Sequence, residues 1–294
     1  MPSASSSAPV RAFGPTVAGR FYPGQSERLR SSIAGYLAQA SGPGPKLGPA
    51  RRIVGLIAPH AGYVYSGPIA GTAYATVASS DVRTVIVMSP SHHAHRSKAS
   101  TLLADVYRTP IGDVPIATDA VRGMLAAAPE VVAEDPEVFL PEHALDVQIP
   151  FVKVALPNAR LIPLIVPLMA PERLAKLASL LFGMFKDDPH ALVIASSDLS
   201  HFFDYETARK IDGEITAEVE QGDVEALIAK HDDRRGPCGA APIAVALEYL
   251  QRLQPPGRAV VLDVRSSGDT QEGNRDRVVG YAAVALVTGG EAGN

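Results

Sequence analysis

Nearly continuous runs of Val, Ile, Leu and Ala alternate with helical patterns along this chain, and this alternation limits its fold more than any other feature. Four such runs span residues 51–59, 82–90, 159–167 and 190–198. Strands buried on both faces of a parallel sheet have this composition, because no position along them faces water. Helical patterns separate or follow the runs at residues 66–79, 171–185, 204–230 and 239–253. The sequence therefore predicts an α/β fold, a three-layer sandwich in which helices flank a central sheet that is mainly parallel or mixed.

The two ends of the chain differ from this pattern. Residues 1–12 are rich in Ser and Ala, and we expect them to form a disordered tail. Residues 13–290 are expected to form a single α/β domain, since 46% of the residues are hydrophobic and can bury a large core. Within this domain, an N-terminal helix precedes a flexible connection at 41–49 that is rich in Gly and Pro. The last two apolar runs, at 257–267 and 276–288, are expected to form an antiparallel edge of the sheet.

Composition excludes several classes of function. The formal net charge is −4, from 27 basic and 31 acidic residues, so nucleic acid and anionic membranes are poor partners. The longest apolar segment, residues 161–170, is interrupted by Pro163 and Pro167 and is too short to cross a bilayer as a helix. The single cysteine, Cys238, excludes an internal disulfide and suits a reducing compartment. We therefore expect a soluble, cytoplasmic protein.

Five of the eight histidines lie just beyond the carboxyl ends of predicted strands. They are His60 after the first run, His92, His93 and His95 after the second, and His201 after the fourth. Loops at the carboxyl ends of parallel strands converge on one crevice, so we expect these imidazoles to form a site. Neutral imidazoles from different strands can bind a transition metal, or one of them can activate a nucleophile. His93 and His95 are expected to be solvated or to support the site from outside it, because adjacent side chains diverge on an extended backbone.

Cys238 and Asp198 are the candidates that accompany these histidines. Cys238 directly precedes a predicted helix and follows Arg234 and Arg235, a setting that favours the thiolate over the thiol. The alternative is that Cys238 is a small buried hydrophobic residue, because free cysteines are often only packed. Asp198 lies three residues before His201 and could hold an imidazole in one tautomer or cap the following helix.

Four residues are candidates for the walls of the pocket: His93, His143, Asp146 and Tyr63. Pro141 could open a short helix, and such a helix would place His143 and Asp146 on one face. Tyr63 could line the crevice or pack beneath it.

Several segments spread over nearly the whole chain closely resemble the Memo family, whose bacterial members are labelled AmmeMemoRadiSam system protein B. The segments are "VAGRFYPG", "APHAGYVYSGPIA", "SPSHHAH", "YRTPIGDV", "EHALDVQIPF", "SSDLSHF" and "CGAAPI". The resemblance implies a fold shared with the class III extradiol dioxygenases, the LigB-like non-haem iron enzymes. It also implies a metal site formed by His60, His92 and Cys238. Asp198 would lie beside that site, and His201 would occupy the position where the dioxygenases keep an acid/base histidine.

Two departures from these relatives affect what the resemblance implies. In "EHALDVQIP", His143 is kept, whereas Asp146 and Gln148 stand where relatives carry Glu and His. The third metal ligand would be the thiolate of Cys238, where the iron enzymes have a carboxylate. Such a site can hold Fe(II), which we expect, and it would also accept copper or zinc.

These residues support three functions. The first is an Fe(II)-dependent, dioxygenase-like oxidoreductase that acts on an unknown small molecule, with His201 moving protons and Asp198 orienting it. The second is a non-catalytic metal- or ligand-binding protein that serves in signalling or as a scaffold, and the family label implies radical-SAM proteins as its partners. The third is a metal-free hydrolase, which needs Cys238 within hydrogen-bond reach of a histidine.

Overall fold

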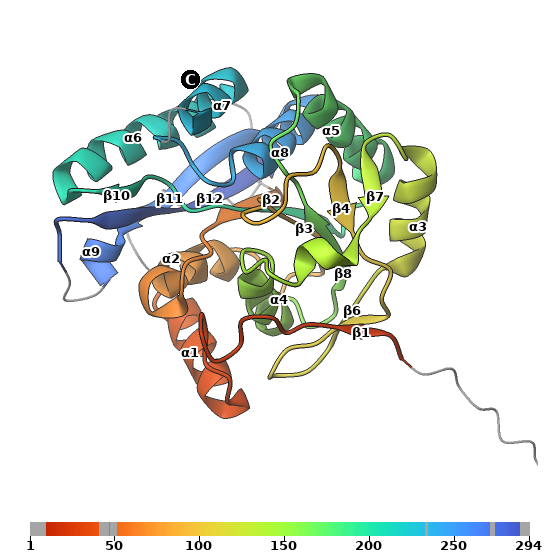
Figure 1. Ribbon diagram of the computed structural model, residues 1–294, viewed down its shortest axis with the longest axis horizontal. Coiled ribbons are helices and arrows are strands. Elements are labelled where there is room, and N and C mark those ends of the chain that lie inside the picture. Colours follow the sequence, from red (N-terminus) through yellow and green to blue (C-terminus); the bar gives the residue numbers. More distant parts are fainter. Residues whose placement is uncertain (1–9, 41–46, 48–51, 233–234, 271–273, 289–294) are drawn as a thin grey trace, which may run out of the picture.

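A central sheet with helices on both faces makes up the molecule in the computed structural model (Figure 1), which describes residues 10–40, 47, 52–232, 235–270 and 274–288. The helices are α1 (Ser26–Ala38), α2 (Tyr63–Ala75), α3 (Thr118–Ala127), α4 (Ile149–Ala155), α5 (Pro171–Phe185), α6 (Tyr205–Gln221), α7 (Val224–Asp232), α8 (Ala240–Arg252) and α9 (Ser267–Thr270). The strands are β1 (Ala12–Phe13), β2 (Arg52–Ala58), β3 (Thr84–Ser89), β4 (Ala99–Thr101), β5 (Val106–Tyr107), β6 (Val114–Pro115), β7 (Val132–Glu134), β8 (Arg160–Ile165), β9 (Ala191–Ser196), β10 (His201–Phe203), β11 (Arg258–Ser266) and β12 (Val278–Thr288). Two 3-10 helices, η1 (Pro136–Phe139) and η2 (Asp146–Gln148), complete the elements.

The large sheet confirms the predicted α/β fold and is mixed. Its strand order is β10-β12-β2-β9-β3-β8-β4-β7, with β11 paired to β12. The four central strands, β2, β9, β3 and β8, are parallel, and nearly all of their side chains are buried. The closing strands β11 and β12 are antiparallel, as expected, but β12 also pairs with β2 on its other side. A separate small sheet has the order β1-β5-β6.

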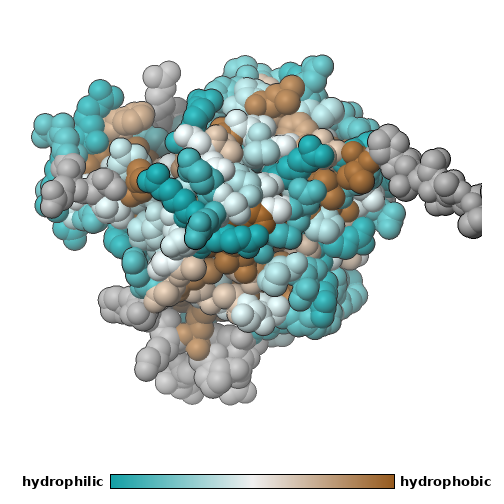
Figure 2. Space-filling model, turned by 90° about the horizontal axis from the view of Figure 1, so that it is seen from below, coloured by the Kyte–Doolittle hydropathy of each residue, from teal (hydrophilic) through white to brown (hydrophobic). Residues whose placement is uncertain are grey.

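Two groups of helices cover the two faces of the sheet. In Figure 1, α5, α6, α7 and α8 lie on one face, and α1, α2 and α4 lie on the other. Helix α5 shows why these segments are helical: Pro171 stands at its start, and the residues that recur at helical spacing, Leu174, Leu177 and Leu181, are buried. Seen from below (Figure 2), hydrophilic and hydrophobic residues are interspersed on the surface. No helix within the described ranges has the length and apolarity that crossing a membrane requires.

The described residues differ from the sequence predictions near the N-terminus. Residues 1–9 of the predicted tail lie outside them, but Ala12 belongs to β1 and pairs with Val106 of β5. The predicted flexible connection at 41–49 also lies outside them, apart from Leu47. Helix α2 begins at Tyr63, three residues before the predicted start at residue 66.

Candidate metal centre and pocket

The loops that leave β2, β3 and β9 meet at one edge of the sheet, because these strands are neighbours and run parallel. His60 follows β2, His92 follows β3, and Cys238 directly precedes the N-cap of α8. One nitrogen of each imidazole and the Sγ atom of Cys238 all lie within 4.8 Å of one another. Cys238 Sγ and His60 Nε2 are 3.2 Å apart. The structure thus brings together the three residues that the sequence resemblance suggested as metal ligands.

A buried hydrogen-bond network fixes the tautomer of His60. The hydroxyl of Tyr74 donates to Oε1 of Gln148 at 2.9 Å, so the amide nitrogen of Gln148 faces Ser196 and donates to its Oγ at 2.8 Å. The Ser196 hydroxyl donates to the carbonyl of Ala144 at 2.8 Å. Ser196 Oγ must therefore accept from His60 Nδ1, 2.9 Å away. His60 Nε2 is left with its lone pair directed toward Cys238, which is the form of imidazole that binds a metal.

Glu142 orients His92 in a similar way. Its carboxylate accepts the backbone N–H of His92 at 2.7 Å and His92 Nδ1 at 2.9 Å, and it also accepts the N–H of Ala144 at 2.9 Å. Burial acts to raise the pKa of Glu142, but the hydrogen bonds from His92 outweigh it and lower that pKa to about 2. Burial acts to lower the pKa of His92, yet Glu142 leaves it raised. Nδ1 of His92 is thus committed to Glu142, which leaves Nε2 for a metal.

His143 lies against the same centre. Its ring stacks on His92, with centroids 4.8 Å apart, and on Phe21 at 4.5 Å. Its centroid is 5.4 Å from that of His60. Burial, with a smaller contribution from His60, lowers the pKa of His143 to about 4, so the ring is neutral near neutral pH. His92, Glu142 and His143 form a second group of donors within 4.8 Å, but the Glu142 oxygens in that group already accept hydrogen bonds from His92 and Ala144.

Asp198 and His201 lie on the wall of an adjoining pocket of about 590 Å³. Asp198 is buried, and its Oδ1 accepts the backbone N–H groups of His60 at 2.8 Å and Ala61 at 3.3 Å. Burial raises the pKa of Asp198, while His201 acts against this. The helix that follows is capped by Asp204, whose side chain accepts from the N–H of Thr207, so Asp198 does not serve as that cap. The remaining lining residues of the pocket include four aromatic side chains: Phe21, Tyr65, Phe202 and Tyr281.

Asp212 on α6 supports the backbone just before His201, which is the first residue of β10. Its Oδ1 accepts the backbone N–H of Ser200 at 3.0 Å, and its carboxylate lies so close to Gly280 that a Cβ on Gly280 would overlap it. The side chain of Ser200 is buried without a hydrogen-bond partner among the described residues. Burial raises the pKa of Asp212 to about 6. The position of His201 therefore depends on a carboxyl group buried at a cost.

The substitution Asp212→Asn is expected to stabilise the metal-free protein near neutral pH. The pKa of Asp212 is about 6 in the folded protein and 3.8 ordinarily, so the folded state holds this proton more tightly. The free energy of unfolding therefore falls as the pH rises from 3.8 to about 6. Asparagine keeps the acceptor for Ser200 and removes the charge, so we expect a gain of about 2 kcal/mol at about pH 7. Urea unfolding of both proteins between about pH 4 and pH 8 tests this. A wild-type stability that runs parallel to that of the variant across this range would contradict it.

Two candidates for the pocket walls lie elsewhere. Asp146 is fully buried and accepts hydrogen bonds from the backbone N–H of Val17 at 2.9 Å and from the hydroxyl of Tyr22 at 2.8 Å. The prediction that it shares a helical face with His143 is wrong, because no regular element spans both residues and the 3-10 helix η2 begins only at Asp146. Tyr63 is also buried beneath the site, where its hydroxyl donates to the carbonyl of Val147 at 2.8 Å. Through its bonds to Val17 and Tyr22, Asp146 anchors the N-terminal segment that carries Phe21.

Of the other expectations for this region, the one for the exposure of His93 and His95 is met and the one for the Cys238 thiolate is not. His93 and His95 are exposed, as expected, but the proposal that His93 forms part of the pocket wall is wrong, because it is not among the residues that line the pocket of His201. The expectation that Cys238 favours the thiolate is wrong for the metal-free protein, because burial and the charge of Asp198 raise the pKa of its thiol. Arg235 is exposed, and Arg234 lies outside the described residues. These surroundings do not activate Cys238 as a nucleophile, although a histidine is within reach, so they disfavour a hydrolase.

Three residues help to orient the imidazoles, but these roles were not identified from the sequence: Glu142, Gln148 and Ser196. Ser196 is the last residue of β9, where a polar side chain at the carboxyl end of a buried strand is a usable signal. Glu142 directly precedes a histidine in "EHALDVQIP", but nothing in that spacing indicates that its partner is His92, 50 residues away.

Comparisons with known proteins give a family from the sequence and a similar fold from a solved structure. The sequence profile of the family described as "Memo-like protein" matches residues 14–285. A "MEMO1 family protein" of Ignicoccus hospitalis is 33% identical over 284 residues, covering 92% of this chain and 96% of the relative. Another, of Desulfurococcus amylolyticus, is 31% identical, covering 92% and 97%. The crystal structure of the uncharacterized protein JW3007 from Escherichia coli K12 has a similar fold, with a TM-score of 0.51 and 16% identity, over 80% of this chain and 100% of that one.

Proposed function

The chain belongs to the Memo-like protein family, and from this premise we propose that it is a metal-binding redox protein, an oxidoreductase of the dioxygenase-like kind. Its metal is Fe(II), with copper as the alternative, and the ligands are His60, His92 and Cys238. The observation that carries the proposal is the convergence of these three donor atoms within 4.8 Å at the carboxyl edge of the sheet.

The donor set fits a transition metal. Cys238 Sγ and His60 Nε2 lie 3.2 Å apart, close enough for both atoms to contact a single metal ion. Both imidazoles have their Nδ1 atoms engaged by other groups, which prepares each Nε2 as a ligand. The raised pKa of the Cys238 thiol belongs to the metal-free state, because a bound cation would displace its proton.

When bound, the metal supplies Lewis acidity and electron transfer at the edge of the pocket. The chain supplies the other functions. Asp198 holds the backbone of His60 and faces the same pocket as His201, which can exchange a proton with a ligand bound there. His143 offers a neutral imidazole on the same wall. The aromatic side chains around the pocket suit an organic ligand with an apolar body.

Anaerobic reconstitution tests this function. Protein loaded with Fe(II) and passed through a desalting column is expected to retain a single iron per chain and to consume oxygen when an organic substrate is supplied. The variant His201→Gln is expected to retain iron and lose most of the oxygen consumption, because it removes the proton-transfer group and no metal ligand. Iron retention without oxygen consumption for any substrate would favour the non-catalytic binding function instead. Failure to retain iron, copper or zinc would contradict both.

A further inference from the structure

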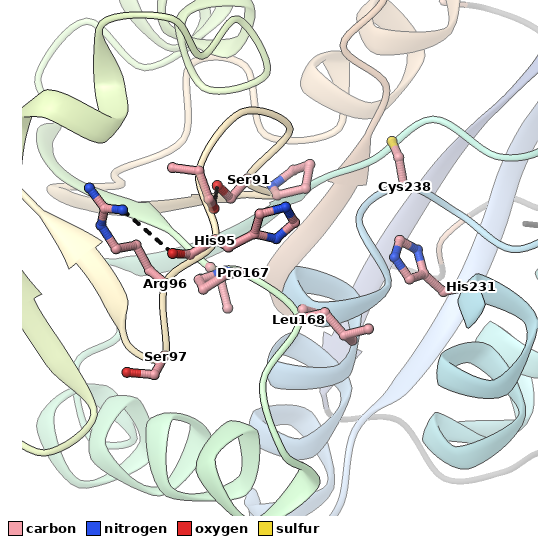
Figure 3. A pocket seen from close by; sticks show the side chains of 12 residues that line it. Ser91, His95, Arg96, Ser97, Pro167, Leu168, His231 and Cys238 are labelled. Carbon is pink, nitrogen blue, oxygen red and sulfur yellow. Dashed lines mark hydrogen bonds between the residues drawn. The ribbon is translucent and has the colours of Figure 1, made fainter.

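A second cavity, of about 600 Å³, is lined by Cys238 and shares no lining residue with the pocket of His201. Figure 3 shows this cavity with Cys238 at one side, the ring of His231 close to it, and the ring of His95 turned toward both. His231 lies near the end of α7, and His95 lies on the loop that carries His92. The cavity therefore joins the surface to the one cysteine of the chain past two imidazoles.

The geometry of His231 leaves a metal-binding lone pair available. Its Nδ1 lies 3.1 Å from the carbonyl oxygen of Pro237, and since a carbonyl can only accept, Nδ1 carries the proton. In the neutral form of the ring Nε2 then carries the lone pair, and it has no hydrogen-bond partner among the described residues. His95 is exposed on the opposite wall, and its ring makes no hydrogen bond within the same part of the chain.

The cavity offers a metal ion neutral imidazole and thiol donors and no carboxylate. No Asp or Glu is among its lining residues, within the part of the chain that the structure describes. Arg96 is paired with Asp135 at 2.8 Å, so its charge is offset. Imidazole and thiol donors without carboxylates select transition metals over Mg²⁺ and Ca²⁺.

We propose that this cavity is the route by which a transition metal enters, with His95 and His231 as transient ligands that pass the ion to Cys238. The proposal rests on the metal site proposed above and adds how that site is loaded. Neither histidine belongs to the final site, because no described group of three donors within 4.8 Å includes either of them. A transient ligand raises the local concentration of metal next to Cys238 and leaves the end state unchanged.

Stopped-flow loading with Co(II) tests the route, because the cobalt–thiolate charge-transfer band reports arrival at Cys238. In His231→Ala and in His95→Ala, the association rate is expected to fall by about tenfold. The dissociation rate should fall by a similar factor, so the equilibrium affinity stays within about twofold of wild type. His190→Ala is the matched control, since His190 is partly exposed, precedes the amino end of β9, opposite the edge that carries the site, and hydrogen bonds to the carbonyl of Asp81. A further variant, Leu168→Trp, should also slow association, because Leu168 lines the cavity and is 40% exposed.

Three outcomes overturn the route. Association rates for His231→Ala and His95→Ala equal to that of His190→Ala, with a normal thiolate band, overturn the route and leave the metal site intact. A loss of equilibrium affinity in His231→Ala as large as that in a variant of a proposed ligand would make His231 a resident ligand, which also overturns it. If wild-type protein gives no thiolate band with Co(II), both the route and the proposed metal site fail.

Discussion

Replacement of Cys238 by serine is expected to lower the affinity for Fe(II) by about a hundredfold or more, because a neutral hydroxyl replaces the only thiolate donor. The sulfur lies 3.2 Å from His60 Nε2, so the substitution leaves the two imidazoles without their third partner. The variant His60→Ala should lose metal to a comparable extent, because it removes the imidazole whose tautomer Gln148 and Ser196 hold. Iron content after anaerobic purification and desalting measures both effects.

The control for this prediction is the stability of the metal-free proteins. Serine is smaller than cysteine and keeps a polar atom at the same position, so chelator-treated Cys238→Ser should unfold within about 1 kcal/mol of wild type. Loss of iron from a folded variant then reports on the site and not on the fold. Equal iron in wild type, Cys238→Ser and His60→Ala would remove the proposed metal centre.

The predictable parts of the fold are the strands and helices whose buried residues follow a regular apolar pattern along the sequence. Strands β2, β3, β8 and β9 are apolar except at their ends, and α5 repeats its buried leucines at helical spacing, so each was found close to its true bounds. The region between β3 and β8 gave no such signal. Its strands β4 to β7 have two or three residues each, too few for any periodicity, and their pairing with distant segments decides their conformation.

In the candidate site, too, only the residues next to predicted strands could be found from the sequence. His60, His92, Asp198 and His201 follow strands that the sequence predicts, so their convergence could be expected. The supporting groups could not be found in this way, because their partners depend on three-dimensional packing. Asp146 is the clearest case: its carboxylate resembles a pocket residue in sequence, yet it holds the N-terminal segment through bonds to residues more than a hundred positions away.

Alanine in place of Gly239 is expected to destabilise the protein by about 3 kcal/mol, through overpacking against backbone that cannot move. Gly239 caps α8 directly after Cys238, and a Cβ there would lie 2.4 Å from the carbonyl oxygen of Ser196 and 2.5 Å from the Cβ of Ser197. These atoms belong to the end of β9 and the loop that follows it. To relieve the overlap, the start of α8 must move away from the sheet, and Cys238 must move with it away from His60.

The same substitution should therefore affect the metal site together with the fold. We expect the affinity for Fe(II) to fall by about tenfold in Gly239→Ala, because Cys238 keeps its chemistry but loses its position. Gly183→Ala is the matched control, since Gly183 lies in α5 and a methyl group added there would have no neighbouring atom within 4 Å. It should stabilise the protein by up to about 1 kcal/mol through helix propensity and leave metal binding unchanged. Urea unfolding and iron content of the two variants give the comparison. If Gly239→Ala unfolds at the wild-type urea concentration, α8 is not held against β9 as closely as its contacts require.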